Sequence, residues 1–367
     1  MSIRAAIRPR RSVFTALAAG VALALSVPVG AAHADPPTDD PQTAADYAAG
    51  WLADQFATDA DGAYIPLPAG GANVSDTAQS ALALAAAGAE EATFDDAVDW
   101  LTANAADIIA VGGADDPGRI GYLLLLADAA GEDPTDFGGV DLLDRLDGTL
   151  TSSGLYGTAD PTWDGVFRQS LALLGLRAHG ETVPTTARNW LADQQCDAAS
   201  PAAAAGGFPS YRADTTVACT ASGPETNSTA LAVQAFAAVD ATAYGAAVDD
   251  ALDYLAGAQE ADAGFPFAPG YGSDPNSTAL VVQAIAAAGE DPAGTAWQVG
   301  GSTPYDSLLS WQIGCDAPAS DVGAFASPWS SGAPDQLATQ QAVWGAAGTP
   351  FPLDPSFTSP TPVPCTA

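Results

Sequence analysis

Two stretches of this chain are nearly identical: NSTALAVQAF at residues 227–236 and NSTALVVQAI at residues 276–285. On a helix of 3.6 residues per turn, both are apolar on nearly every side, so protein must surround each of them. A segment of this kind is either one structural part used twice or one binding surface used twice. The sequence around the two copies decides the fold into which they fit.

A second kind of helix alternates with the first. In AAVDDALDYLAGAQ, the apolar Val248, Leu252 and Leu255 share one stripe, while Asp249 and Asp253 face away from it. Such an amphipathic helix lies at a surface, with its stripe against the protein interior. Alternation of buried and amphipathic helices therefore predicts an inner layer and an outer layer of helices.

The alternation continues through the chain, with a glycine and an aromatic residue recurring between outer and inner helix, as in GGFPSY from Gly206 and GFPF from Gly264. Glycine supplies the left-handed conformation that ends many helices. The pattern predicts outer helices at 44–55, 94–104, 140–150, 185–195, 244–259 and 305–312. It predicts inner helices at 75–87, 118–130, 165–179, 227–239, 276–288 and 335–347.

Six hairpins with wholly apolar inner helices predict an all-α protein, an α/α toroid whose inner helices form a central barrel. An open solenoid is the alternative, but its terminal repeats would carry polar capping faces, and neither terminal hairpin differs from the rest. Residues 35–349 are the expected toroid domain. Residues 350–367 are the expected proline-rich tail, stapled by a disulfide.

Residues 1–34 have the pattern of a secretion signal: four arginines, an apolar run, then Ala32-His33-Ala34 as a cleavage site. The pattern leaves general and twin-arginine export open. Residues 35–367 keep six arginines, no lysine and all 44 acids, a net charge of −38. That charge repels nucleic acid and anionic membranes, and no later apolar run is long enough to span a bilayer. We expect an extracellular protein.

Four cysteines in an exported chain predict two disulfides, for which three pairings exist. The pairing that closes the shortest loops joins Cys196 to Cys219 and Cys315 to Cys365. With every thiol oxidised, none remains as a nucleophile or a zinc ligand.

The chain resembles the α/α-toroid superfamily, which includes prenyltransferases, squalene cyclases and cobalamin carriers of the transcobalamin and intrinsic factor type. The resemblance lies in a glutamine followed by a glycine and an aromatic residue, as at Gln259, Gly264 and Phe265, and in the inner-helix openings at Val74 and Asn276. These openings are most similar to the barrel helices of the cobalamin carriers. The fold hosts unrelated chemistries, so the resemblance implies fold more strongly than function.

Differences from these families exclude several of their activities for this chain. Prenyltransferases bind zinc through Asp, Cys and His, but His179 is the one histidine after the signal. Squalene-type cyclases use a DxDD acid motif, which this sequence lacks. The thioester proteins of this fold need a cysteine followed shortly by glutamine, which GCDAP at Gly314 does not supply. The carriers add a smaller β domain, so its absence implies weak ligand binding or a second protein in its place.

All inner helices of a ring point the same way, so their N-termini meet at one mouth of the barrel and offer N–H groups and positive dipoles to a polar ligand. The candidate ligand-binding residues at this mouth are Ser75, Asp76, Thr77, Arg119, Tyr122, Asp164, Asn227, Ser228, Asn276, Ser277, Asp335 and Gln336, with the aromatic residues Trp163, Tyr211, Tyr271 and Trp329.

The simpler interpretation is that Asp76, Asn227 and Asn276 only cap helices, each worth about 1 kcal/mol. The buried amides Gln79, Gln234, Gln283 and Gln340 favour a pocket, because an amide on an apolar helix needs a polar partner. Both interpretations stay open.

Other signals are weaker. DADG at Asp59 resembles part of a calcium loop but lacks the later glutamate. The acid pairs Glu90-Glu91 and Asp115-Asp116 read as solvated surface, and His179 reads as a helix-end residue. A glycosidase would need two carboxylates about 5 to 10 Å apart, a role open to Asp76, Asp164 and Asp335.

The leading hypothesis is a secreted, non-catalytic protein that binds a small molecule at the barrel mouth, with cobalamin as the first candidate ligand. An enzyme of the terpene cyclase type and a glycan-active surface protein are the alternatives. No catalytic residue and no metal site is predicted.

Overall fold

The computed structural model describes residues 38–157, 165–357 and 365. Every helix expected from the sequence is present. The outer helices are α1 (Pro41–Ala53), α3 (Glu91–Ala103), α6 (Leu142–Asp147), α8 (Thr185–Asp193), α10 (Gly245–Ala258) and α12 (Pro304–Leu309). The inner helices are α2 (Val74–Ala87), α5 (Pro117–Ala130), α7 (Val166–Ala178), α9 (Thr226–Asp240), α11 (Pro275–Ala287) and α13 (Gln336–Ala347).

Short elements in the loops were not expected from the sequence. They are α4 (Ala105–Ile109), a 3-10 turn (Thr295–Trp297), and two antiparallel hairpins: β1 (Ala57–Thr58) with β2 (Ala63–Tyr64), and β3 (Ala110–Val111) with β4 (Ala114–Asp115). Strands of two residues are too short to show a hydrophobic period, so the sequence gives no sign of them.

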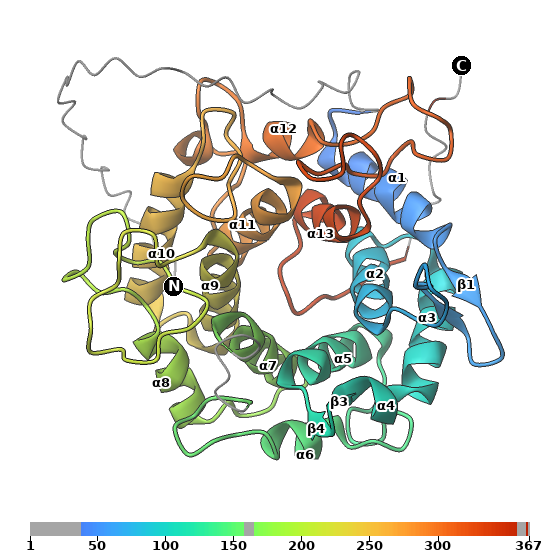
Figure 1. The fold of residues 1–367 in the computed structure, drawn as a ribbon, viewed down its shortest axis with the longest axis horizontal. Helices are drawn as coiled ribbons and strands as arrows, with labels where there is room; N and C mark the ends of the chain where they lie inside the picture. Colours follow the sequence, from blue (N-terminus) through green and yellow to red (C-terminus); the bar gives the residue numbers. More distant parts are fainter. Residues whose placement is uncertain (1–37, 158–164, 358–364, 366–367) are drawn as a thin grey trace, which may run out of the picture.

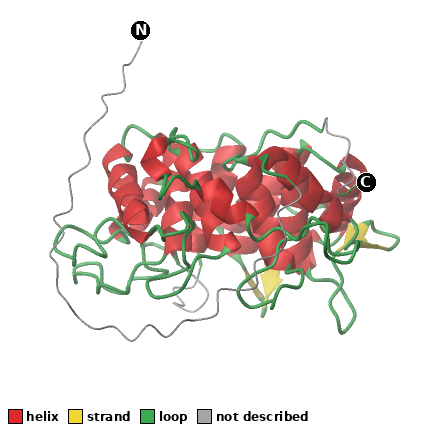
Figure 2. Ribbon diagram, turned by 90° about the horizontal axis from the view of Figure 1, so that it is seen from above, coloured by secondary structure: helices red, strands yellow, loops and turns green. Residues whose placement is uncertain are grey.

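The helices form a closed ring of two layers (Figure 1). Each inner helix packs against its two inner neighbours, and α13 closes the circle by packing against both α11 and α2. Seen from the edge, the ring of helices is a flat slab, and most of the long loops lie on one side of this slab (Figure 2). The ring excludes the open solenoid, and the protein is an α/α toroid.

Burial separates the two layers as their sequences predict. In α11, 10 of 13 residues are buried, whereas in α10 only 5 of 14 are, and these include Val248, Leu252 and Leu255 from the predicted stripe. The apolar residues of both layers belong to one core cluster. Inner helices are therefore apolar on all sides because they pack against outer helices and against each other.

A polar side chain near the start of five inner helices ties the helix to the loop before it, and in the two NST segments this side chain is the threonine. Thr278 Oγ1 accepts the backbone N–H of Phe265 at 3.0 Å, and Thr229 Oγ1 accepts that of Phe208 at 2.9 Å. The same bond joins Thr77 to Ile65 and Thr339 to Phe325, while Gln169 takes this role for Tyr156. In these five loops a buried residue shortly after the glycine, Ile65 in one loop and an aromatic residue in the other four, is thus fixed by a side chain that satisfies its N–H group.

Residues 349–357, hereafter the C-terminal strap, leave α13 and cross the ring at the end opposite the inner-helix N-termini (Figure 1). Along its length the strap contacts Gln283 on α11, Gln234 on α9 and Phe94 on α3. The predicted disulfide pairing is confirmed: Cys196 joins Cys219 and Cys315 joins Cys365. Residues 1–34, interpreted as an export signal, lie outside the described residues.

Candidate binding site at the barrel mouth

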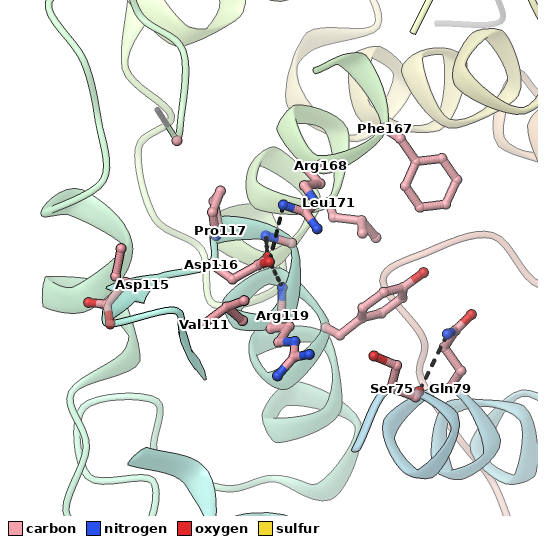
Figure 3. Close-up of a pocket in the computed structure, with 14 residues that line it drawn as sticks. Ser75, Gln79, Val111, Asp115, Asp116, Pro117, Arg119, Phe167, Arg168 and Leu171 are labelled. Carbon is pink, nitrogen blue, oxygen red and sulfur yellow. Dashed lines mark hydrogen bonds and ion pairs between the residues drawn. The ribbon is translucent and has the colours of Figure 1, made fainter. Parts of the chain in front are cut away.

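A cavity of about 560 Å³ lies at the mouth of the barrel, between the N-terminal halves of α2, α5 and α7. Ser75 and Gln79 line it from α2, opposite Phe167, Arg168 and Leu171 from α7 (Figure 3). The remaining lining residues come from α5 and the hairpin before it: Val111, Ala114, Asp115, Asp116, Pro117, Gly118, Arg119 and Tyr122, with Gly157.

Asp116 fixes the α5 side of this cavity. Its Oδ1 accepts the N–H groups of Gly118 at 2.9 Å and Arg119 at 3.0 Å, which makes it the N-cap of α5, and Pro117 occupies the first helical position. The other oxygen pairs with Arg168 Nη1 at 3.1 Å. The carboxylate is 8% exposed, so the helix end and the arginine together compensate its burial.

Asp115 turns away from Asp116 (Figure 3) and pairs with Arg145 of α6. The expectation that Asp115-Asp116 is solvated surface was therefore wrong for Asp116, which is buried, and for Asp115, which is half-buried in an ion pair. A capping pattern explains the error: an aspartate directly before proline is the N-cap of a helix that the proline begins.

Two cations line a cavity in a strongly acidic protein. Arg119 directs Nη1 to the backbone oxygen of Ile108 at 2.8 Å, and Arg168 pairs with Asp116. They are two of the six arginines in residues 35–367. The two arginines are far apart in the sequence, so the packing of α5 beside α7 brings these scarce cations to one cavity.

The wall of the cavity is amphipathic. Phe167, Leu171 and Val111 supply apolar surface, while Ser75 and Gln79 supply hydroxyl and amide groups. Burial raises the pKa of Tyr122 well above its usual range, so the phenol is a neutral hydrogen-bond donor across the physiological pH range. Such a wall can orient a small molecule that has both an apolar body and polar groups.

The predicted site residues Asp76, Thr77 and Gln336 lie beside this cavity, where α2 meets α13. Gln336 Nε2 donates to Ser80 Oγ at 3.1 Å, and Gln340 Nε2 donates to the same hydroxyl at 3.0 Å and to the backbone oxygen of Asp76 at 3.1 Å. Burial raises the pKa of the Asp76 carboxyl, although hydrogen bonds oppose the shift. Thr77 is fully buried and serves as the loop tie described above.

Asp76, Asn227 and Asn276 are not N-caps, which corrects the simpler interpretation of these residues. The caps lie two or three residues earlier, at Asn73, Glu225 and Asp274. Each helix begins earlier than periodicity indicated, because the polar residues of its first turn hide its start.

Ser228 and Ser277 are also buried parts of these helix starts. Ser228 N–H donates to Glu225 at 2.8 Å, and Ser277 donates both its N–H and its hydroxyl to Asp274. Asn276 reaches the next inner helix, where its Nδ2 donates to Gln341 Oε1 at 3.1 Å. Asn227, Ser228, Asn276 and Ser277 therefore surround the mouth on the α9 and α11 side but do not line the cavity.

Two buried acids at the helix starts were missed from the sequence. Glu225 is 8% exposed and Asp274 is 1% exposed. Burial raises the pKa of Glu225 to about 7, an increase that its hydrogen bonds from Ser228 and Asn227 only partly oppose, and burial also raises the pKa of Asp274. Both acids act as N-caps of their helices, and neither lines the cavity.

The buried amides have protein partners. Gln234 Oε1 accepts the N–H of Phe351 at 3.1 Å, and Gln283 Nε2 donates to the oxygen of Thr349 at 2.7 Å. Both partners belong to the C-terminal strap, so these glutamines lie at the far end of the barrel from the cavity. Gln79 remains as the one predicted amide that lines the cavity, and Gln340 lies beside it.

The expected aromatic residues do not form one cluster. Tyr271 and Trp329 are 56% and 66% exposed on loops of the mouth side, with Phe267 edge-on to Tyr271 at a ring separation of 6.2 Å. Tyr211 packs against Trp190. The predicted residues Trp163 and Asp164 lie outside the described residues.

The acidic residues around Asp59 do not form a metal site within the described residues. Asp59 and Asp61 face Asp96 and Asp99 across a surface hollow, but within the described part of the chain no group of three or more His, Cys, Asp or Glu residues could hold a metal ion. His179 follows α7 at its C-terminal end, with Nε2 2.8 Å from the backbone oxygen of Leu124. Of the helices in this part of the chain, none has both the length and the apolar character of a bilayer span.

Comparison with family models finds no match, and comparison with curated proteins finds none. Solved structures do match. A protein from Actinoplanes is 18% identical, with 84% of this chain and 98% of that chain covered and a TM-score of 0.54. The type II terpene cyclase MstE from Scytonema, in complex with geranylgeranyl dihydroxybenzoate, is 12% identical, with coverage of 84% and 97% and a TM-score of 0.59.

The GH76A alpha-1,6-mannanase from Salegentibacter is 13% identical, with coverage of 84% and 98% and a TM-score of 0.58. The identities are low, so these matches establish the α/α-toroid fold alone. A terpene cyclase and a mannanase on one fold illustrate how different sites occupy the same ring of helices.

Proposed function

We propose that this protein is exported and binds a small amphipathic molecule in the cavity at the barrel mouth, without acting on it chemically. The observation that carries the proposal is the cavity itself. Its volume falls in the range of about 300 to 1,000 Å³ typical of small-molecule sites, and its wall combines apolar side chains with a few fixed polar groups.

A binding role fits the state of the cavity's carboxylates. Among the described residues that line it, Asp116 is engaged by the helix N-terminus and Arg168, and Asp115 is engaged by Arg145. Hydrolysis of a glycosidic bond uses two carboxyl groups that face the same bond. Asp115 and Asp116 point in different directions and are held by partners, which favours binding over hydrolysis here.

Export is supported by the apparent signal at residues 1–34 and by the two disulfides, which form in oxidising compartments. Cobalamin is the first ligand to test, because the inner-helix openings resemble those of cobalamin carriers. A corrinoid is larger than the drug-sized ligands that a cavity of this volume encloses. A partner protein at the mouth would therefore have to cover the part of the corrinoid that protrudes from the cavity.

The test is calorimetric titration of the purified protein with hydroxocobalamin and cyanocobalamin at fixed salt. Phe167→Ala removes apolar wall from the cavity and is expected to weaken binding by at least tenfold. Asn276→Ala, at the mouth but outside the cavity, is the matched control and is expected to leave affinity unchanged. If Asn276→Ala loses binding and Phe167→Ala does not, the site lies at the centre of the mouth and not in the cavity. If the titrations release no heat, the hypothesis that the protein binds a corrinoid is refuted.

A second candidate is glycan binding on the mouth side. Phe267 and Tyr271 are exposed aromatic side chains that lie edge-on to each other at 6.2 Å on the loop before α11, and exposed apolar side chains that lie together mark interaction sites. Trp329 is exposed on the loop before α13. The mannanase with the same fold has also been solved, as an inactive variant, with alpha-1,6-mannotriose. Titration with this trisaccharide, compared between the unmodified protein and Tyr271→Ala, tests the idea; equal affinity for both would refute it.

An enzyme of the terpene cyclase type has less support. A DxDD motif is absent from the sequence, and the described inner wall carries the amides Gln234, Gln283 and Gln340. Incubation with geranylgeranyl diphosphate, followed by mass spectrometry of extracted products, would detect cyclisation.

A further inference from the structure

Both carboxylates in the described wall of the mouth cavity are paired with arginines. Asp115 pairs with Arg145 of α6, and Asp116 pairs with Arg168 of α7 at 3.1 Å. Gly118 makes room for the second pair, because a Cβ atom there would lie 2.8 Å from Cγ of Arg168. A carboxylate paired with a cation repels an approaching anion far less than a lone carboxylate does. The two aspartates therefore do not close this cavity to an anion.

Arg119 is a third cation at the same cavity. No carboxylate of the described residues pairs with it, and its guanidinium donates from Nη1 to the backbone oxygen of Ile108 at 2.8 Å. A carbonyl group has no net charge, so three guanidinium groups against two carboxylates leave one positive charge in excess. Arg119 is half-buried and lines the cavity. Because a guanidinium has several N–H donors, some of them remain for a ligand.

The first turn of α7 adds to the positive potential. Its N-cap is Gly165, which has no side chain to accept an N–H group, and Phe167 and Arg168 of this turn line the cavity. A helix N-terminus attracts negative groups, and a capping carboxylate offsets that attraction. The other inner helices have polar side chains as caps, namely Asn73, Asp116, Glu225, Asp274 and Asp335. The cavity thus meets the one inner helix whose N-terminus no described side chain caps.

Nearby acids of the described residues do not reverse this balance. Charges on a protein surface are screened over about 8 Å at physiological salt, so the groups beside the cavity dominate its potential. Asp76, next to the lining residue Ser75, does not line the cavity and accepts a hydrogen bond from Asn73. The excess charge of Arg119 therefore acts inside the cavity although the chain as a whole is acidic.

The rest of the wall selects an apolar body with a single anionic group. Phe167 and Leu171 of α7 and Val111 of the hairpin supply apolar surface (Figure 3). One excess positive charge matches one carboxylate, whereas a phosphate ester carries about −1.5 to −2 at neutral pH. The planar guanidinium also matches both oxygens of a carboxylate.

We propose that the ligand of the mouth cavity is a monoanionic amphiphile, a carboxylic acid with an apolar body, and that Arg119 binds its carboxylate. This proposal rests on the proposed function of the cavity and narrows it to one class of ligand. Arg119 is then the residue that distinguishes the acid from a neutral molecule of the same shape. The apolar body lies against Phe167 and Leu171, where it is removed from water.

Two measurements on the full chain separate the cavity from its charge. N-phenyl-1-naphthylamine, a neutral apolar fluorophore, first reports whether the cavity takes up an apolar molecule, and Phe167→Ala should weaken its binding about tenfold. Decanoate and decanamide, which have the same chain and differ in the charge of the head, then compete with the fluorophore at neutral pH. We expect decanoate to bind at least about tenfold more tightly, and added salt to reduce this difference.

Variants of Arg119 show whether it is the source of the difference. Arg119→Gln should lower the affinity for decanoate to that for decanamide and leave the affinity for decanamide unchanged, whereas Arg119→Lys should keep part of the preference. Arg177→Gln is the matched control, because Arg177 also donates to a backbone oxygen, that of Ala238, but lies in the last turn of α7 at the other end of the barrel. It changes the net charge equally and should alter neither affinity.

The outcomes distinguish this proposal from the proposed function. If the fluorophore does not bind, or Phe167→Ala leaves its binding unchanged, both are overturned. If the fluorophore binds in the cavity but decanoate and decanamide displace it equally, the cavity function stands and the acid specificity is refuted. Equal weakening of both probes by Arg119→Gln would show that Arg119 only shapes the wall, which also refutes it. Circular dichroism checks each fold, and the salt dependence in wild type replaces any variant that does not fold.

Discussion

Replacement of Glu225 by glutamine should change how stability depends on pH. Glu225 is 8% exposed at the start of α9, and burial raises its pKa from an ordinary 4.5 to about 7. Between these two values the folded protein keeps a proton that the unfolded chain has lost. Stability from this group is therefore fully present below about pH 4.5 and is lost as pH rises to about 7.

The size of the effect follows from the shift. A pKa difference of about 2.5 units corresponds to about 3 kcal/mol, since one unit is about 1.4 kcal/mol. Glutamine cannot ionise and accepts through one oxygen only, so its lost capping bond is a constant offset of about 1 kcal/mol at every pH. The difference in unfolding free energy between wild type and Glu225→Gln should then fall by about 3 kcal/mol from pH 4.5 to pH 8.

Urea denaturation followed by circular dichroism at half-unit pH intervals measures this difference directly. Glu260→Gln, on the surface of the loop after α10, controls for replacement of a glutamate as such. The comparison between two proteins cancels the titration of all other acids. A difference that stays constant from pH 4.5 to pH 8 would show that burial of Glu225 does not perturb its protonation, and would refute the reasoning.

Three further substitutions test the tertiary contacts by denaturation. Thr278→Val leaves the buried N–H of Phe265 without its acceptor and should cost about 1 to 3 kcal/mol; a cost near zero would show that the tie is dispensable. Gly88→Ala should cost more than Gly131→Ala, because both glycines are left-handed but only Gly88 meets the strap, whereas equal losses would place the strap elsewhere. Arg168→Gln removes the partner of a buried carboxylate and should cost about 2 kcal/mol, less if water replaces the guanidinium.

The candidate site was predicted only in part. Ser75, Arg119 and Tyr122 were expected at the mouth and line the cavity, because position in the first turns of an inner helix is readable from the sequence. Phe167, Arg168 and Leu171 were missed, since on an all-apolar helix no period shows which face meets a cavity. Asn227 and Asn276 were expected in a pocket, yet they lie on the side of the mouth that the cavity does not reach.

The sequence by itself determined the ring. Helical period and hydrophobicity are local properties of the sequence, so the alternation of apolar and amphipathic helices, with glycine between them, specified twelve helices in two layers. Loop length favoured the disulfide pairing that the structure has. Only the tertiary structure decided which polar groups meet. The strap reaches Gln234 from more than a hundred residues away along the chain, and Arg168 reaches Asp116 from the next inner helix. Such pairings depend on how whole helices pack, which no local pattern of residues records.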